Sequence, residues 1–326
     1  MARDEAWLLS RLARGPCSGD ELARELTLTR SGVWKRIGAL REAGVEIVAE
    51  RGRGYRLARP VVLLDADAIE RQLPPPARSC LSRLEVVWET DSTNARLLAA
   101  PAPVAGCRVL LAERQSAGRG RRGRAWVSPL AANLYFSVSR RFHTPLARMG
   151  GLSLAVGVAL AEAVAALGVS GAGVKWPNDV WVGRRKLAGV LIETGGELGG
   201  PLDVVVGVGL NVAMPEAEGT RIGQDWTDLL REGCRHDRNA VAAAVLGGLL
   251  PALEQFDRQG LPPFLERFAR LDALAGAPIE LASPLGLVRG RALGVADDGG
   301  LRVALDSGGE QRFHGGEASL RAVTEE

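Results

Sequence analysis

A nine-residue stretch, Gly118–Trp126, concentrates positive charge in an otherwise nearly neutral chain. Its sequence GRGRRGRAW holds four arginines and three glycines, whereas the formal net charge of all 326 residues is +3. Guanidinium groups bind carboxylates and phosphates through paired hydrogen bonds, and glycine lets backbone N–H groups approach an anion closely. Such a stretch is a solvated loop, a nucleic-acid contact, or a loop that closes around an anionic small molecule.

Predicted strands flank this arginine-rich loop on both sides. Apolar residues 109–112 precede it, and the stretch NLYFSV at 133–138 follows it. Short apolar runs of this kind are typical of buried strands. A loop strung between two strands of one sheet is held at both ends, which argues against a disordered nucleic-acid tail.

Further polar clusters adjoin predicted strands. The first, DSTN at residues 91–94, precedes a helical stretch, so its side chains either cap that helix or face a ligand. Taken singly, Lys186 is equally well explained as a surface lysine, and Asp179 as a turn residue. The other clusters are KWPNDV, RKLAGVLIE and GVGLNV, at residues 175–180, 185–193 and 207–212.

The first 59 residues form a basic unit on a nearly neutral body. They carry twelve Lys/Arg and eight Asp/Glu, whereas residues 60–326 carry 29 basic and 30 acidic residues. Three amphipathic helices, the last from residue 30 to 43, precede a short hairpin, and this order resembles a winged helix-turn-helix. Three-helix units also serve as protein-binding modules, but eight Lys/Arg against three Asp/Glu over residues 29–59 favour DNA.

The residues that would meet DNA lie on the third helix and the wing. Helical spacing buries Val33 and Ile37 and turns Ser31 and Lys35 outward. Lys35 reaches either guanine or a phosphate, and its type alone does not choose. Trp34 is predicted to pack against the protein rather than to contact bases. The candidate DNA-binding residues are Arg30, Ser31, Lys35, Arg36, Arg51 and Arg53.

The ordered clusters together resemble the biotin protein ligases. DSTN, QSAGRGRRGRAW, KWPNDV, RKLAGVLIE and GVGLNV occur in the order and approximate spacing of that family, and GGEASLR at residues 315–321 extends the match. The basic front unit resembles the subclass that is also the biotin operon repressor. The resemblance implies an α+β multidomain protein: a winged helix-turn-helix (1–63), a mixed α/β ligase domain of the biotin/lipoate type (64–272) and a small SH3-like β-barrel (273–326).

The resemblance implies a reaction in two steps. ATP, with Mg²⁺, activates biotin to biotinyl-5′-AMP, and biotin then passes to a lysine of the biotin carboxyl carrier protein of acetyl-CoA carboxylase. Two anions must meet in the first step, and at 4 Å they repel by about 1 kcal/mol in water and by more in a protein. Cations between them are therefore required, and the arginine-rich loop and Lys186 supply them.

The site residues are carried over motif by motif. Asp179 either holds Mg²⁺ with phosphate oxygens or accepts a proton from the carrier lysine, while no dedicated metal site is expected. Glu317 and Arg321 are candidates from the last motif, with a packing or surface role equally open. The biotin-binding set is Ser92, Thr93, Asn94, Gln115, Arg119, Gly120, Arg121 and Lys186; the nucleotide-binding set is Gly118, Trp126, Asn178 and Asn211; the catalytic set is Arg119, Arg121, Lys186 and Asp179.

The coexistence of both halves suggests that the adenylate is also a corepressor. We expect the loaded loop to close, complete a homodimer surface and place the dimer on biotin operon operator DNA. The rivals are a ligase without DNA binding, a lipoate-type ligase, and a biotin-sensing repressor without transfer activity.

The composition of the chain indicates the cellular compartment in which the protein is expected. Four scattered cysteines show no zinc or disulfide spacing, and the N-terminus lacks a secretory signal pattern. The most apolar stretch, residues 151–169, contains Glu162 and three glycines and is predicted to be a buried helix. A cytoplasmic protein without a membrane partner is expected.

Overall fold

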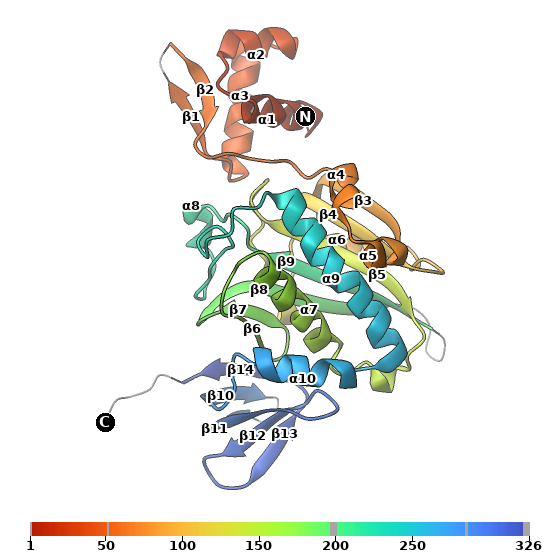
Figure 1. The fold of residues 1–326 in the computed structure, drawn as a ribbon. Helices are drawn as coiled ribbons and strands as arrows, with labels where there is room; N and C mark the ends of the chain where they lie inside the picture. The colour runs from red at the N-terminus through yellow and green to blue at the C-terminus, as the bar shows by residue number, and fades with distance from the viewer. Residues whose placement is uncertain (1, 51, 196–200, 284–285, 322–326) are drawn as a thin grey trace, which may run out of the picture.

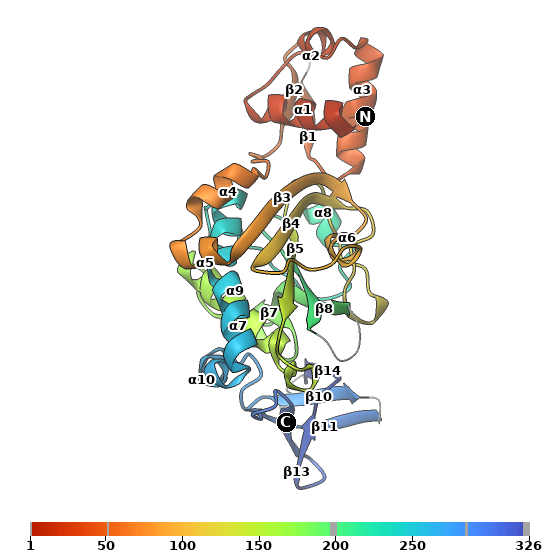
Figure 2. The ribbon, with the colours of Figure 1, turned by 90° about the vertical axis from the view of Figure 1, so that its right-hand side faces the viewer.

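A computed structural model describes residues 2–50, 52–195, 201–283 and 286–321. Three parts follow one another along the molecule: a small helical unit, a central sheet with helices, and a small β unit at the opposite end (Figures 1 and 2). The predicted order of parts is confirmed.

The N-terminal unit is three helices followed by a two-stranded wing. Ser18 caps the second helix, because its hydroxyl accepts from the Glu21 N–H and the Glu21 carboxylate accepts from the Ser18 N–H. The elements are α1 (Ala2–Ala13), α2 (Gly19–Glu25), α3 (Arg30–Glu42), β1 (Ile47–Glu50) and β2 (Gly54–Leu57).

The prediction for Trp34 is wrong. Its side chain is 64% exposed on α3, whereas Val33 and Ile37 are buried. Successive helical residues are about 100° apart, so the position after Val33 already lies to the side of the core-facing stripe. The unit's core is filled by leucines of α1 and α2 instead, including Leu8 and Leu22.

The central part is built on a seven-stranded mixed sheet in the order β3-β4-β5-β9-β8-β7-β6. Only β3 and β4 run parallel; the other neighbours are antiparallel. The arginine-rich loop connects β4 to β5, as predicted. The strands are β3 (Leu81–Thr90), β4 (Cys107–Gln115), β5 (Leu134–Phe142), β6 (Ala172–Lys175), β7 (Asp179–Val182), β8 (Arg185–Gly195) and β9 (Leu202–Leu210).

Helices cover the sheet unequally. Two long apolar helices, α7 (Leu152–Ala166) and α9 (Arg238–Gln259), pack together beside it, and short α6 (Thr93–Leu98) contacts strands β4, β5, β8 and β9 (Figure 1). Among the described residues, α9 alone has the length and hydropathy of a membrane span, and most of it is buried. The remaining central helices are α4 (Ala66–Gln72), α5 (Pro75–Cys80), α8 (Glu216–Gly219) and α10 (Pro262–Leu271).

The C-terminal unit is a five-stranded antiparallel sheet. Its order is β13-β12-β11-β10-β14, so the last strand returns beside the first. This sheet lies where the resemblance implies the small SH3-like β-barrel. The elements are β10 (Pro278–Ser283), β11 (Gly286–Val295), β12 (Leu301–Leu305), β13 (Glu310–Phe313) and β14 (Glu317–Leu320).

Two attachments fix the N-terminal unit to the sheet. In the connecting segment, the Val62 carbonyl accepts from the Arg238 guanidinium, which also forms a buried ion pair with Glu113 (2.6 Å). After the arginine-rich loop, the Leu130 N–H donates to the carbonyl of Ala43, the residue that ends α3 (2.8 Å). Helix α3 is therefore anchored at its C-terminal end to the segment that follows the loop.

Candidate active site

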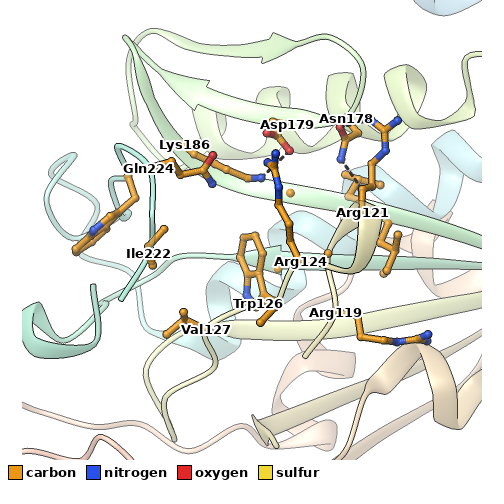
Figure 3. A pocket seen from close by; sticks show the side chains of 18 of the residues that line it. Arg119, Arg121, Arg124, Trp126, Val127, Asn178, Asp179, Lys186, Ile222 and Gln224 are labelled. Atoms are coloured by element: carbon orange, nitrogen blue, oxygen red, sulfur yellow. Dashed lines mark hydrogen bonds and ion pairs between the residues drawn. The ribbon is translucent and has the colours of Figure 1, made fainter. Parts of the chain in front are cut away.

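One cavity of about 870 Å³ gathers nearly all the predicted biotin and nucleotide residues. The arginine-rich loop, strands β8 and β9, residues 221–226 and the start of β14 line it (Figure 3). Gly118 and Arg321 are not among its lining residues. The predicted residues that line it are Ser92, Thr93, Asn94, Gln115, Arg119, Gly120, Arg121, Trp126, Asn178, Asp179, Lys186, Asn211 and Glu317.

One end of the cavity is a network of neutral polar groups at the start of α6. The Gln115 carbonyl oxygen accepts from the Thr93 N–H (2.9 Å), and the Ser137 hydroxyl lies 2.7 Å from the Thr93 hydroxyl and 2.5 Å from Asn94 Oδ1. Ser92 is the helix cap as well, since its hydroxyl accepts from the Ala95 N–H. Capping and facing a ligand are thus compatible roles, and the network offers both donors and acceptors.

Glu193 links this polar end to the arginine-rich loop. Its carboxylate accepts from Asn94 Nδ2 (2.8 Å) and from Arg119 Nη2 (3.0 Å). Glu193 and Ser137 were not predicted. Glu193 is the last residue of the RKLAGVLIE motif, so the sequence could have marked it as a site residue. Ser137 is one polar residue on a buried strand, and only the fold shows that it belongs to the site.

Glycines of β9 make the floor of the cavity. A Cβ at Gly207 would lie 2.2 Å from Asn94 Oδ1, and one at Gly209 would lie 2.2 Å from the Trp126 ring. Alternate residues of a strand face the same side, so two missing side chains open one continuous space. The GVGLNV motif therefore shapes the floor beneath Asn94 and Trp126.

The middle of the cavity carries the cations. Lys186 Nζ lies 2.9 Å from Asp179 Oδ1 and 5.5 Å from the Trp126 ring centroid, and Arg121 Nη1 donates to Asn178 Oδ1 (2.8 Å) (Figure 3). Burial lowers the pKa of the Arg121 guanidinium, with a smaller contribution from Arg122. A guanidinium held in a desolvated place interacts strongly with an anion that enters it.

The arginine-rich loop is a small hairpin rather than an extended tail. The Trp126 N–H donates to the Gly118 carbonyl (2.9 Å) and the Gly120 N–H to the Arg124 carbonyl (2.7 Å), so Gly118 closes the base of the loop. Arg124 forms a paired contact with Glu317 of β14 (2.8 and 2.6 Å), and this pairing lowers the pKa of the Glu317 carboxyl. Glu317 thus ties the loop to the C-terminal unit, while Arg321 pairs with Asp306 instead.

A strap between β9 and α9 lies across the other end, and sequence reasoning missed it. The Lys186 N–H donates to the Asp225 carbonyl, and the Thr227 N–H donates to the Lys186 carbonyl. This holds residues 222–226 over the cavity, and Figure 3 labels Ile222 and Gln224 of this strap. No compact motif marks this segment, because its backbone, not a set of charged side chains, attaches it.

Two polar atoms near the nucleotide set lack partners within the described part of the chain. They are Trp126 Nε1 and Asn211 Oδ1, both buried. The Asn211 amide nitrogen donates to the Thr227 carbonyl (3.0 Å), which fixes its orientation. Because buried polar atoms normally have partners, these two are suited to hydrogen bonds with a ligand.

The predicted DNA residues occupy different electrostatic surroundings. Arg30 is ion-paired with Asp20, and Arg36 with Asp4 (3.1 Å). Lys35 is exposed and has no ion-pair partner among the residues that the structure describes, and the Ser31 hydroxyl is exposed but hydrogen-bonds to that of Thr29. Arg53 is exposed on the wing. Arg51 lies outside the described residues.

Three family models match the three parts in order. An HTH-domain model matches residues 7–56, the biotin/lipoate A/B protein ligase family matches residues 89–211, and a biotin protein ligase C-terminal domain matches residues 276–321. The solved biotin protein ligase from Aquifex aeolicus in complex with biotin and ATP aligns with a TM-score of 0.62 and 29% identity, over 74% of this chain and 99% of that one.

Whole-length relatives agree. The bifunctional ligase/repressor BirA of Salmonella typhimurium is 39% identical over 97% of both chains, and that of Escherichia coli is 38% identical over the same shares. The biotin–[acetyl-CoA-carboxylase] ligase of Mycobacterium tuberculosis is 38% identical over 70% of this chain and 84% of its own. The chain belongs to the biotin protein ligases. Within them it falls with the bifunctional ligase/repressors, which confirms the predicted family and subclass.

Proposed function

We propose that this cavity joins biotin to AMP and then passes biotin to a carrier lysine. The observation that carries this proposal is the division of the cavity into three zones. A neutral polar end around Thr93 and Asn94 matches the donors and acceptors of a ureido ring. A cationic middle follows, and an aromatic end around Trp126 matches adenine. A single small ligand would not need all three zones.

The cationic middle brings the reacting groups together. Arg121 and Lys186 would lie between the biotin carboxylate and the α-phosphate, where they reduce the repulsion and stabilise the charge that develops at phosphorus. Arg119, held by Glu193, would position the biotin carboxylate. Closing the loop over the mixed anhydride excludes the water that would hydrolyse it.

The second step transfers biotin to the carrier. The carrier lysine nitrogen attacks the biotinyl carbonyl carbon, the bond to the AMP oxygen breaks, and AMP leaves. The Asp179 carboxylate lies 2.9 Å from Lys186 Nζ at this centre, so it is available either for Mg²⁺ or for the lysine proton. The biotin carboxyl carrier protein of a carboxylase is the proposed acceptor.

Magnesium would enter with ATP rather than occupy a protein cage. Among the described residues no group of three or more His, Cys, Asp or Glu is arranged to hold a metal. Mg²⁺ commonly takes one or two carboxylates and completes its shell with phosphate oxygens and water. Asp179 fits that limited role.

The first experiment measures transfer. Purified protein with ATP, Mg²⁺, biotin and an apo carrier domain should add one biotin to the carrier lysine, read by mass spectrometry. Lys186→Ala should abolish transfer, whereas Arg185→Ala should not, because Arg185 is exposed and paired with Glu232 outside the cavity. Biotin bound without transfer would favour a sensor, and preference for lipoate in competition would favour the lipoate-type rival.

The N-terminal unit would bind operator DNA as part of an adenylate-loaded homodimer. Exposed Lys35 on α3 and Arg53 on the wing support DNA contact, and the anchoring of Ala43 to Leu130 supports communication with the loop. Adenylate should tighten binding to the protein's own biotin operator, measured by fluorescence anisotropy at fixed salt, with sedimentation reporting the dimer. Equal binding by loaded and empty protein would contradict the coupling.

A further inference from the structure

The outward face of α3 lacks the composition of a helix surface that stays in water. We define this face by four residues at positions i, i+3, i+4 and i+7 of the helix, which are Ser31, Trp34, Lys35 and Gly38. Helix surfaces in water are usually filled with polar residues that favour a helix. Here Trp34 is 64% exposed, and Gly38 lies inside the helix. Two of the four positions are therefore poorly suited to a face that only meets solvent.

Gly38 is not required by the packing or the backbone of the folded chain. A Cβ at this position would meet no atom within 4 Å, and Gly38 does not have the positive φ that favours glycine. Glycine destabilises a helix interior relative to alanine, so the helix loses stability here without a gain in the free protein. What glycine does provide is space above the helix, where another molecule can approach the backbone closely.

The surroundings of Trp34 fit the major groove of DNA better than another protein surface. Neighbouring Lys35 is exposed without an ion-pair partner in the described part of the chain, and Arg53 on the wing is exposed as well. These charges attract phosphates, whereas the indole between them is apolar. The apolar feature that a base pair displays in the major groove is the C5-methyl group of thymine. Recognition helices contact base edges through their N-terminal residues, and Trp34 lies in the first half of the 13-residue α3.

We propose that Trp34 contacts a thymine methyl group of the operator, and that Gly38 provides the space that lets the DNA approach the helix. The inference rests on the proposed DNA-binding function and adds to it a residue that reads a base. The indole and the methyl group leave water together, and no phosphate charge is neutralised by the contact. Trp34 therefore distinguishes thymine from other bases without contributing to the salt dependence of binding.

The test removes the methyl group and the indole separately. Operator duplexes in which each thymine in turn is replaced by deoxyuridine lack one C5-methyl group each. Adenylate-loaded protein, titrated by fluorescence anisotropy at fixed salt, should bind at least one such duplex about fourfold less well, the loss expected for one buried methyl. Trp34→Ala should bind the thymine operator about tenfold less well and should no longer distinguish that duplex from it. Its salt dependence should equal that of the unsubstituted protein, because no phosphate contact is lost.

Gly38→Ala tests the space above the helix independently. The added methyl fits the free protein, so the midpoint of urea unfolding should rise, whereas operator binding should weaken about tenfold. The control is Leu287→Ala, because Leu287 is 61% exposed on β11 of the C-terminal unit, at the opposite end of the molecule (Figure 1). It should leave operator binding unchanged. Trp34→Ala should biotinylate the carrier at the unsubstituted rate, which verifies that the variant is folded.

Several outcomes overturn the inference. Normal operator binding by Trp34→Ala shows that the indole does not touch the DNA. Weak binding that still depends on the same thymine methyl assigns the contact to another residue. Reduced self-association of Trp34→Ala without DNA, measured by sedimentation, assigns the indole to a second copy of the chain. If Trp34→Ala does not fold, normal operator binding by Gly38→Ala overturns the inference. Absence of operator binding by the unsubstituted, adenylate-loaded protein refutes the proposed DNA function, and this inference with it.

Discussion

The cavity and the recognition helix both display basic side chains, but the fold treats them differently. In the cavity, Arg119 and Arg124 are each held by an acid from a distant strand, Glu193 or Glu317, and both line the same cavity. On α3, Arg30 is paired with an acid of the neighbouring helix, and only Lys35 stands free among the basic residues described there. Acidic partners therefore orient the basic side chains of the cavity, whereas on α3 they neutralise the charge of the basic side chains.

This difference shows when residue types are sufficient to predict a role. Five motifs in a fixed order together identify the residues that share one site. The cavity residues could therefore be grouped before any fold was known. A surface helix carries no comparable set of ordered motifs. The acidic partners of its basic side chains come from other helices, and residue types alone do not reveal them.

Filling the cavity floor should be the most damaging change. In Gly207→Ala the new methyl would overlap the Asn94 amide, so Asn94 must leave its place in the polar network. We expect biotin affinity to fall about 100-fold, about 2.7 kcal/mol, by calorimetry. Gly195→Ala on β8 is the control, because a Cβ there meets only ordinary contact with Leu98 at 3.7 Å. Unchanged biotin binding in Gly207→Ala would contradict this account of the floor.

Removing the free cation of α3 should weaken DNA binding about tenfold. Lys35→Ala loses a contact worth about 1–3 kcal/mol if it reads a base, and loses it selectively at one operator position. If it contacts a phosphate, binding weakens uniformly and the salt dependence becomes shallower. Anisotropy titrations with operator variants at several salt concentrations distinguish these alternatives. Wild-type affinity under all conditions would remove Lys35 from the interface.

Freeing a paired arginine should have a small opposite effect. Asp20→Asn removes the acid that neutralises Arg30, so DNA affinity at low salt should rise by about two- to threefold. Arg30 also holds the pKa of the Asp20 carboxyl below its usual range, so the pair persists at neutral pH. The same titrations measure the change, and unaltered or weaker binding would show that Arg30 is not near the phosphates.

Replacing Trp34 should barely change stability. Trp34→Ala is expected to shift the free energy of unfolding by about 0.5 kcal/mol or less, because the side chain is 64% exposed. Trp176→Ala, at 2% exposure, should cost about 3–5 kcal/mol in the same urea titration. A large loss in Trp34→Ala would restore the packing role that the sequence predicted.

The sequence predicted the parts, the loop between two strands and most of the cavity lining, because those depend on local patterns and motif order. It did not predict what side chains from distant strands would add. Ser137 and Glu193 join the site through β5 and β8, and the strap joins through backbone hydrogen bonds. Trp34 was misjudged because apolar character predicts burial only where the helix faces its core.

The anchoring of α3 has a consequence for operator architecture. The helix-turn-helix unit is joined to the sheet both by the connecting segment and by the Ala43–Leu130 hydrogen bond. In any dimer formed through the central parts, these attachments would hold the two α3 helices at a separation set by the ligase domains. Half-sites must match that separation in whole helical turns. The ligase domains would thus determine the half-site spacing that one dimer can occupy.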